Sequence, residues 1–313
     1  MPTLNEIQQT ILDKKNASQD EVRRDYLKKL SDYTNRDVII YSSAFATTKA
    51  AMIPPLFLSL VIDDMPGFMS AMHGMKRDNL DLILHSPGGS MEAAEQIVLY
   101  LRSKYKHIRA IIPQNAMSAA TMLACACDTI IMGKHSAIGP IDPQVTFPTP
   151  NGAFTVPAQS ILDEFEQAKM EIVANPNTAV LWIEKLRAYP YGFLSLCQTT
   201  ITLAAEKVGQ WLDAYMFKSV AVGQKPGKKI AAWLGDAKLH KTHSRPINIA
   251  TAQAQGLKVE PLEDDQQLQE LVLSVFHATM VTFGVTKCIK ITENHDGRGL
   301  YLQVEVKPVF PSA

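Results

Sequence analysis

Two short turns, separated by a single crossover, constrain the fold of this chain more than any other feature. The first closes the apolar run Leu82 to Ser90, which ends in Ser-Pro-Gly-Gly-Ser, and the second is Asn115 to Thr121, with Ser118 at its centre. Each has the pattern of a buried strand that enters a tight turn and then a helix. The first turn offers bare glycine amides, and the second offers a serine at a helix start. Held side by side, they would supply a nucleophile and an oxyanion hole.

The apolar runs around these turns predict an α/β fold with a parallel sheet. Strands are expected over 80–85, 108–112 and 128–132, joined by helices over 90–103 and 118–126. Continuous apolar strands of this kind are typical of parallel sheets, whose crossovers are right-handed. The remaining expected elements are a strand over 37–41, helices over 64–75, 157–174, 200–222, 230–239, 249–255 and 264–282, loops over 147–156 and 224–229, and a hairpin of 288–292 with 300–306.

Three parts of the chain are expected. Residues 1–36 form an N-terminal helical arm, because 4–33 are polar with apolar residues at helical spacing. Residues 37–262 form the main domain, and 263–313 form a C-terminal helix and β-hairpin.

Charge and hydropathy exclude several classes of protein. The 313 residues contain 31 Lys and Arg and 31 Asp and Glu, which argues against an electrostatic nucleic-acid binder. No apolar run reaches the roughly 18 residues of a spanning helix, and the longest, Ala50 to Ile62, is broken by Pro54-Pro55. The polar N-terminus lacks the pattern of a signal peptide. A cytoplasmic protein without a membrane span is expected.

The four cysteines are interpreted as thiols rather than metal ligands. Cys125 and Cys127 are too close for an ordinary disulfide and lie in a run of small apolar residues, which favours buried free thiols. The chain has no Cys/His cluster with zinc spacing. Neither a metal nor another cofactor is expected.

The glycine turn, Ser86 to Ser90, allows two interpretations. Glycines adopt positive φ and let another molecule approach the backbone, and the amides that follow favour an anion. The glycine-rich phosphate signatures are absent from the chain. The turn is therefore either a plain strand-to-helix connection or part of a site that stabilises negative charge.

Ser118 is either a helix N-cap or a nucleophile. It follows a buried strand, as the serine of a nucleophile elbow does. Its neighbours Ala116, Ala119 and Ala120 leave room for a substrate. A single crossover also places it at the same sheet edge as the glycine turn.

These segments resemble a known clan of peptidases. Ser86-Pro-Gly-Gly and Ala116-Met-Ser-Ala-Ala-Thr121 are similar to the Clp protease proteolytic subunit and signal peptide peptidase A clan. Residues 126–144 look most like the serine dehydrogenase proteinase family within it. The resemblance covers about residues 37–260 and implies a crotonase-like ββα superhelix. It also implies a serine peptidase that acts on polypeptides and forms a homo-oligomer, with Ser118 as nucleophile and the amides of Gly89 and Ala119 as oxyanion hole.

The base that activates Ser118 is less evident. Clp-type members use a histidine and then an aspartate, but residues 138–144, Ile-Gly-Pro-Ile-Asp-Pro-Gln, contain no histidine. Signal peptide peptidase A members use a lysine. In the helix over 157–174, Lys169 falls within the apolar arc formed by Ile161, Leu162, Phe165, Ile172 and Val173. A lysine desolvated there would have a lowered pKa, as a neutral base requires. It would otherwise extend to solvent or pair with a carboxylate.

Two histidines are auxiliary candidates. His135 lies in a turn at a strand end, and His243 lies in a loop before the predicted helix over 249–255. His243 is either an orienting residue or an ordinary loop histidine. No aspartate near it can be matched to the Clp-type triad, and Asp142 is interpreted as a cap in a proline-rich turn.

Three functions remain open. The first is an ATP-independent serine endopeptidase with a Ser118–Lys169 dyad, for which no ATPase partner can be specified. The second is a crotonase-type enzyme that acts on an acyl-CoA thioester through the same amides, and it predicts a basic pocket for the nucleotide. The third is a catalytically silent scaffold of this fold.

Overall fold

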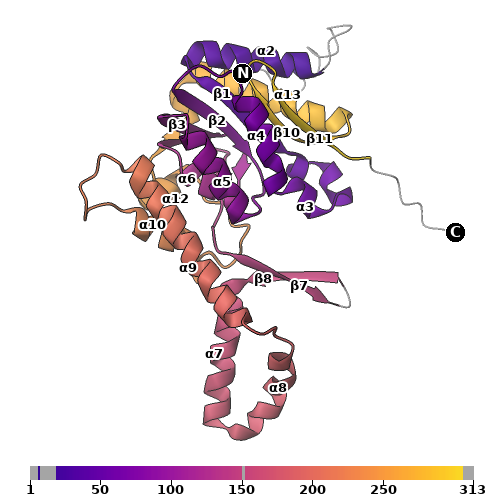
Figure 1. Ribbon diagram of the computed structural model, residues 1–313, viewed down its shortest axis with the longest axis vertical. Helices are drawn as coiled ribbons and strands as arrows, with labels where there is room; N and C mark the ends of the chain where they lie inside the picture. The colour runs from indigo at the N-terminus through magenta and orange to yellow at the C-terminus, as the bar shows by residue number, and fades with distance from the viewer. Residues whose placement is uncertain (1–5, 8–18, 150–151, 306–313) are drawn as a thin grey trace, which may run out of the picture.

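The computed structural model describes residues 6–7, 19–149 and 152–305. A layered body holds both described ends of the chain. A long segment from the middle of the chain projects from this body and is called the arm below; it is distinct from the predicted N-terminal arm (Figure 1). The predicted helices over 4–33 lie partly outside the described residues; residues 6–7 are helical, and the rest of the described part forms α2 (Gln19–Thr34).

A seven-stranded, mostly parallel sheet forms the centre of the body. Its strand order is β11-β10-β1-β2-β3-β5-β9, and the last five strands are parallel. β10 and β11 add an antiparallel edge beside β1. The bounds are β1 Asp37–Ser43, β2 Asn79–His85, β3 His107–Ile112, β5 Thr129–Met132, β9 Val259–Pro261, β10 Cys288–Asn294 and β11 Gly299–Gln303. The predicted mixed α/β fold with a mostly parallel sheet is confirmed.

Helices cover both faces of this sheet, which explains why its strands are apolar on both sides. One face packs against α4 (Met65–Met72), α5 (Met91–Arg102), α6 (Ala119–Cys125) and part of α9 (Phe193–Trp211). The other face packs against α2 and α13 (Gln266–Val285). Successive residues of β1 alternate between these two cores, with Ile39 and Tyr41 in the first and Val38 and Ile40 in the second.

α13 is long and apolar enough to cross a membrane by composition alone. Within the 18-residue apolar stretch of this helix, 67% is buried inside the protein. It packs against α2 and the sheet (Figure 1), as the core helix of a folded domain does.

A small second layer lies at the end of the sheet where the two turns meet. β4 (Asn115–Ala116) pairs with β6 (Ala137–Ile138). Single bridges extend this pair, from Ser86 to Ala116 on one side and from Ile138 to Ile247 on the other. These bridges tie the glycine turn, the serine turn and the loop before α12 (Ile249–Ala254) to one another.

The arm is built from one continuous stretch of chain. It contains the hairpin of β7 (Gln144–Thr149) and β8 (Gly152–Pro157), the helices α7 (Ala158–Ala174) and α8 (Ala179–Arg187), and the first half of α9. The predicted loop over 147–156 is therefore wrong. Proline lacks a backbone N–H, but a two-stranded ribbon has free edges that tolerate it.

The other predicted elements differ mainly at their ends. The helix expected over 200–222 begins earlier, at Phe193, and closes in a π-helical turn over Leu212–Met216. The helix expected over 230–239 is two helices, α10 (Gly227–Leu234) and α11 (Ala237–His240), because Gly235 and Asp236 interrupt it. α3 (Pro55–Leu58) is a short helix that the sequence analysis did not predict.

Candidate active site

Ser118 occupies a strained turn between β4 and α6. Its backbone has φ 51° and ψ −120°, which is rare for a residue other than glycine. Ser118 occupies the N-cap position of α6, but its side chain makes no capping hydrogen bond there, so its hydroxyl is not used as a cap. Strain of this kind at a strand-to-helix turn is what a nucleophile elbow uses to expose its hydroxyl.

The glycine turn lies directly against this serine. The N–H of Ser86 donates to the carbonyl of Asn115 at 3.0 Å, and the N–H of Met117 donates to the carbonyl of Ser86 at 2.9 Å. Gly88 has φ +91°, and a Cβ there would lie 2.6 Å from Cβ of Ser118. Only glycine fits this close approach.

Two backbone amides are left free beside the hydroxyl. The N–H groups of Gly89 and Ala119 donate to no group in the described part of the chain. The residues flanking Gly89 are tied instead, since Gly88 accepts from the N–H of Leu60 at 2.7 Å and the N–H of Ser90 donates to Leu60 at 2.8 Å. Two unpaired donors next to a hydroxyl can stabilise an oxyanion.

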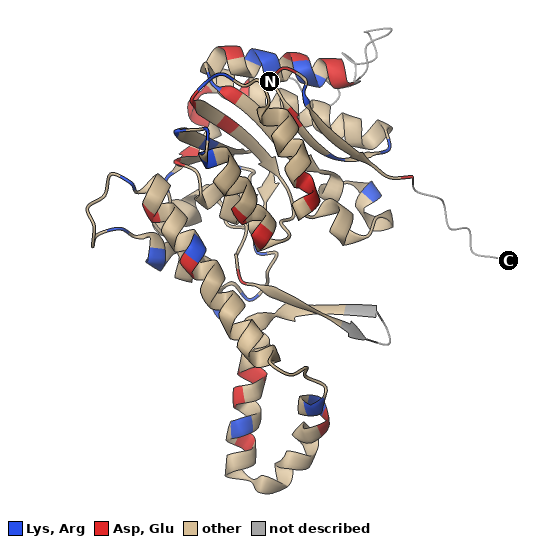
Figure 2. Cartoon of the chain, viewed as in Figure 1, with Lys and Arg blue, Asp and Glu red and all other residues tan. Residues whose placement is uncertain are grey.

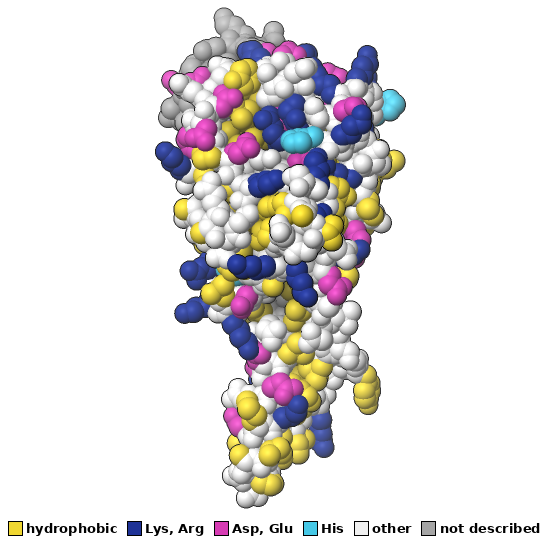
Figure 3. All heavy atoms as spheres, turned by 90° about the vertical axis from the view of Figure 1, so that its left-hand side faces the viewer, with side chains coloured by type: hydrophobic (Ala, Val, Ile, Leu, Met, Phe, Trp, Pro, Cys, Tyr) yellow, Lys and Arg dark blue, Asp and Glu magenta, His cyan; other side chains and the backbone are white. Residues whose placement is uncertain are grey.

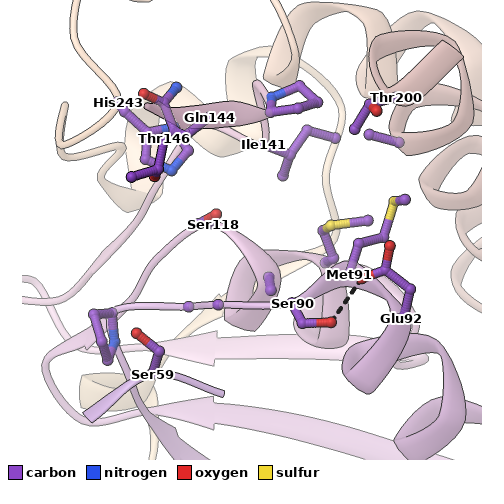
Figure 4. Close-up of a pocket in the computed structure, with 17 residues that line it drawn as sticks. Ser59, Ser90, Met91, Glu92, Ser118, Ile141, Gln144, Thr146, Thr200 and His243 are labelled. Carbon is purple, nitrogen blue, oxygen red and sulfur yellow. Dashed lines mark hydrogen bonds between the residues drawn. The ribbon is translucent and has the colours of Figure 1, made fainter. Parts of the chain in front are cut away.

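Ser118, Gly89 and Ala119 line one cavity of about 460 Å³. Figure 4 shows the Ser118 hydroxyl directed into it, with Ser59 below and His243, Gln144 and Thr146 on the facing wall. Apolar side chains line the end toward α5 and α9, and they come from Met91, Met122, Ile141 and Ala204. No lysine or arginine is among the described residues that line this cavity.

His243 faces Ser118 across the cavity and is held by Asp142. Its Nδ1 lies 2.8 Å from Oδ1 of Asp142, whose side chain is buried. The amide of Gln144 donates to the other carboxylate oxygen at 2.7 Å. Because a carboxylate only accepts, Nδ1 of His243 is the donor, which leaves Nε2 free to accept a proton.

The second layer brings His243 and Asp142 together. Ile138 and Ile247 exchange two backbone hydrogen bonds of 3.1 and 2.9 Å in an antiparallel bridge. Asp142 follows Ile138 by four residues and His243 precedes Ile247 by four, so the antiparallel register carries the two side chains toward each other.

Lys169 does not reach this site. Its side chain is 56% exposed on α7 and its Nζ donates to both carboxylate oxygens of Glu166, at 2.8 and 2.9 Å. It is not among the residues that line the cavity. The expectation of a desolvated lysine at this position is wrong. α7 belongs to the arm and packs mainly against α9, so that much of its apolar arc stays open to solvent.

The other histidines near the turns also lie outside the cavity. Nε2 of His135 lies 2.9 Å from the carbonyl oxygen of Pro113, and His135 is not among the residues that line the cavity. His85 is buried between Phe45 and Phe276 at the end of β2. Burial lowers the pKa of His85 to about 3, so this ring stays neutral beneath the glycine turn.

A carboxylate marks the rim of the cavity. The Ser90 hydroxyl donates to Glu92 at 2.7 Å and accepts from the N–H of Ala93 at 3.1 Å, so it also caps α5. The hydrogen bond from Ser90 lowers the pKa of Glu92. The rim therefore carries a negative charge at neutral pH.

Asp142 is the site residue that the sequence analysis did not assign. The sequence predicts only a cap in a proline-rich turn for this carboxylate, because residues 138–144 contain no histidine. Asp142 and His243 each lie close to a segment of the second layer. This pattern indicates a contact between them only once the bridge between Ile138 and Ile247 is known.

Comparison with known protein families shows which family the chain belongs to. A model of the ClpP-like SDH-type serine proteinases matches residues 10–185, more than half of the chain. The chain belongs to this family. Ser118, Gly89 and Asp142 lie within the matched region, whereas His243 lies beyond its end.

Two uncharacterized proteins of Methanocaldococcus jannaschii are similar to this chain. One is 29% identical over 213 residues, which cover 66% of this chain and 62% of the relative. The other is 36% identical over 132 residues, 42% of each chain. This chain thus spans less than two thirds of the length of either relative.

Proposed function

We propose that this proteinase is an ATP-independent serine endopeptidase with a Ser118–His243–Asp142 triad. The observation that carries the proposal is the Nδ1–Oδ1 pair of His243 and Asp142, which faces the Ser118 hydroxyl across a cavity with two free amides. Family membership supports serine peptidase chemistry. The triad replaces the dyad expected from the sequence, because Lys169 is exposed and paired with Glu166.

Each residue has one role in this mechanism. Oγ of Ser118 attacks the scissile carbonyl carbon while Nε2 of His243 takes its proton, and the carbonyl oxygen becomes an oxyanion bound by the N–H groups of Gly89 and Ala119. His243 then gives the proton to the departing amine, which leaves an acyl-enzyme on Ser118. Water activated by His243 hydrolyses this ester. Asp142 holds the imidazole in the required tautomer throughout.

Oγ of Ser118 has no hydrogen-bond partner within the described residues, and the proposed triad requires the serine and the histidine to approach each other when substrate binds. Catalytic hydrogen bonds are often long in enzymes without ligand. The cavity suits an extended polypeptide, because its apolar end can take a side chain while backbone amides line the opposite wall.

The two rival functions have less support. An acyl-CoA enzyme needs cationic side chains for its nucleotide, and the described lining of this cavity has none. A silent scaffold has no need of a histidine held by a buried carboxylate opposite a strained serine. The second layer of β4 and β6 beside a parallel sheet also supports the finer assignment of a crotonase-like ββα superhelix.

Labelling with a fluorophosphonate probe tests the proposal directly. Wild-type protein and K169A should label at equal rates without nucleotide, while S118A should not label and H243A should label at least about 100-fold more slowly. Peptide mapping of the adduct identifies the modified serine. Labelling that persists in S118A, or that depends on Lys169 and not on His243, contradicts the triad.

Self-association through the arm is a second part of the proposal. Side chains of the arm that lie away from the body are apolar and largely exposed, and Figure 3 shows them gathered on its lower part. They include Met170, Val173, Val180, Leu181, Tyr191 and Leu196. Charged residues of both signs lie on the arm as well as on the body (Figure 2), so the apolar side chains are interspersed with charges. Large exposed apolar side chains gathered on one projecting segment support burial against a second copy of the chain.

A further inference from the structure

A short strap, residues 59–61, fixes the glycine turn from the side opposite Ser118. Leu60 forms both of its backbone hydrogen bonds with this turn, to the carbonyl of Gly88 and from the N–H of Ser90. A Cβ on Gly89 would overlap the carbonyl oxygen of Leu60. The peptide that carries the Gly89 N–H is therefore clamped between the strap and the serine turn, and its direction depends on where the strap lies.

Lys290 holds one end of this strap. It lies on β10, its side chain is only 3% exposed, and its Nζ donates to the carbonyl of Ser59 at 2.6 Å. The same ammonium donates to Oδ1 and Oδ2 of Asp64 at 2.9 and 3.1 Å. Its hydrogen-bonding capacity is thus fully used by the strap and by Asp64.

Asp64 holds the other end of the strap. Its Oδ2 accepts the N–H of Val61 at 2.9 Å and the hydroxyl of Tyr41 at 2.8 Å. Tyr41 is fully buried within β1, so this carboxylate is anchored to the central sheet. Lys290 and Asp64 together connect two strands of the sheet to both ends of the strap.

A buried ion pair is a weak source of stability, because desolvating two charges offsets most of their attraction. Its geometry, however, is specific. The carbonyl of Ser59 and the N–H of Val61 are bound from one side, which leaves Leu60 turned toward the glycine turn. The ion pair therefore fixes the orientation of the strap and contributes little to the stability of the core.

We infer that Lys290 and Asp64 are positioning residues for the oxyanion hole, acting through the strap to aim the N–H of Gly89. The inference rests on the proposed function. Neither residue lines the cavity at Ser118, and both instead line a separate cavity beneath α3, beside Leu56, Phe57 and Leu300. They act on the reacting atoms only through Ser59, Leu60 and Gly89.

Three variants of the full chain test the inference against a matched control. K290M removes both contacts of the ammonium, D64N removes the charge of its partner, and K290R keeps a cation at the site. The control is R23M, which breaks another fully buried ion pair to β10, Nε of Arg23 to Oε2 of Glu293 at 2.8 Å, away from the strap. Kinetics use a peptide–aminocoumarin substrate, and amide hydrogen exchange is followed at Leu60 and Ser90.

A misaimed oxyanion donor lowers kcat, because it acts in the transition state. K290M and D64N should reduce kcat by about 10- to 1,000-fold with KM changed less than about two-fold. The Leu60 and Ser90 amides should exchange faster in both, and K290R should recover part of kcat. R23M should lower the melting temperature while leaving kcat and these two amides unchanged.

Two outcomes overturn the inference. The first is that K290M and D64N lose no more kcat than R23M does when all three variants have lost the same amount of melting temperature. The other is unchanged exchange at Leu60 and Ser90, which would show that the strap does not depend on the pair. Failure of wild-type protein to label at Ser118 would instead overturn the proposed function, and the exchange data would still decide whether Lys290 and Asp64 fix the turn.

Discussion

Nδ1 of His243 lies 2.8 Å from Oδ1 of Asp142, although 101 residues separate them in the chain. The carboxylate is buried and accepts a second hydrogen bond from Gln144, so it holds the imidazole in one orientation. In the proposed triad this pair supplies the base, and its two members come from segments far apart in the sequence.

Replacing Asp142 by asparagine should impair catalysis with little effect on substrate binding. The amide cannot fix the tautomer that presents a basic Nε2, so kcat should fall by about 10²- to 10⁴-fold. Steady-state kinetics on a peptide–aminocoumarin substrate measure this. D163N is the matched control, since Asp163 is an exposed arm residue paired with Lys238. An equal loss of kcat in both variants would contradict the role of Asp142.

Alanine at Gly89 should abolish activity. Its Cβ would overlap the backbone of Leu60, and the φ of +153° is rarely adopted by side-chain residues, so the turn must shift and carry its N–H with it. Gly284 provides the comparison, because it lies in α13 with open space around it. G284A should leave activity unchanged and raise stability by about 0.5–1 kcal/mol. Both effects are read from kcat and from thermal denaturation, and full activity in G89A would exclude its amide from the oxyanion hole.

Acid should destabilise the fold through His85. Burial lowers the pKa of this ring to about 3, below its ordinary value of 6.5. The unfolded chain therefore binds a proton between these values that the folded chain does not bind. His85 makes its full contribution to the free energy of unfolding above pH 6.5. This contribution decreases as the pH is lowered and is smaller by about 2 kcal/mol at pH 5.

Urea denaturation at pH 8 and pH 5 measures this effect. H85Q should lose less stability between the two pH values than wild-type protein by about that amount. H73Q, which changes an exposed histidine, should behave as wild type. An identical pH dependence in H85Q and wild type would show that His85 is not the group that titrates.

Charges on the arm should disrupt self-association. Val180 and Leu181 are 70% and 75% exposed on α8, and burial of glutamate in an interface without a partner is costly. V180E/L181E should shift the mass measured by light scattering to that of a smaller species. V222E is the control, because Val222 is even more exposed, at 95%, but lies in a loop of the body. An unchanged mass in the double variant would place any self-association elsewhere.

The elements around the two turns could be predicted from the sequence because their signals are local. An apolar run that ends in Ser86-Pro-Gly-Gly forms β2 and the turn into α5, with ends within one residue of expectation. The same holds for β3 and for α6 after Ser118. Burial on both faces of a parallel sheet leaves continuous apolar runs that few other structures produce.

The base could not be predicted because it depends on tertiary structure. Helical periodicity places Lys169 on an apolar arc, but it does not show which part of that arc a partner covers. In the structure, α9 covers Ile161 and leaves Lys169 exposed. Among the described residues the buried lysine is Lys290, and the sequence of its strand gives no reason to single it out. The partnership of His243 and Asp142 needed the bridge between Ile138 and Ile247.

The arm supplies part of the substrate cavity as well as the exposed apolar surface. Gln144 and Thr146 of β7 and Thr200 of α9 line the wall that faces Ser118. These residues stand at the root of a lever whose far end lies well outside the body (Figure 1). A displacement of the arm would therefore move one wall of this cavity relative to Ser118, so the proposed self-association and the proposed binding of a peptide would be mechanically coupled.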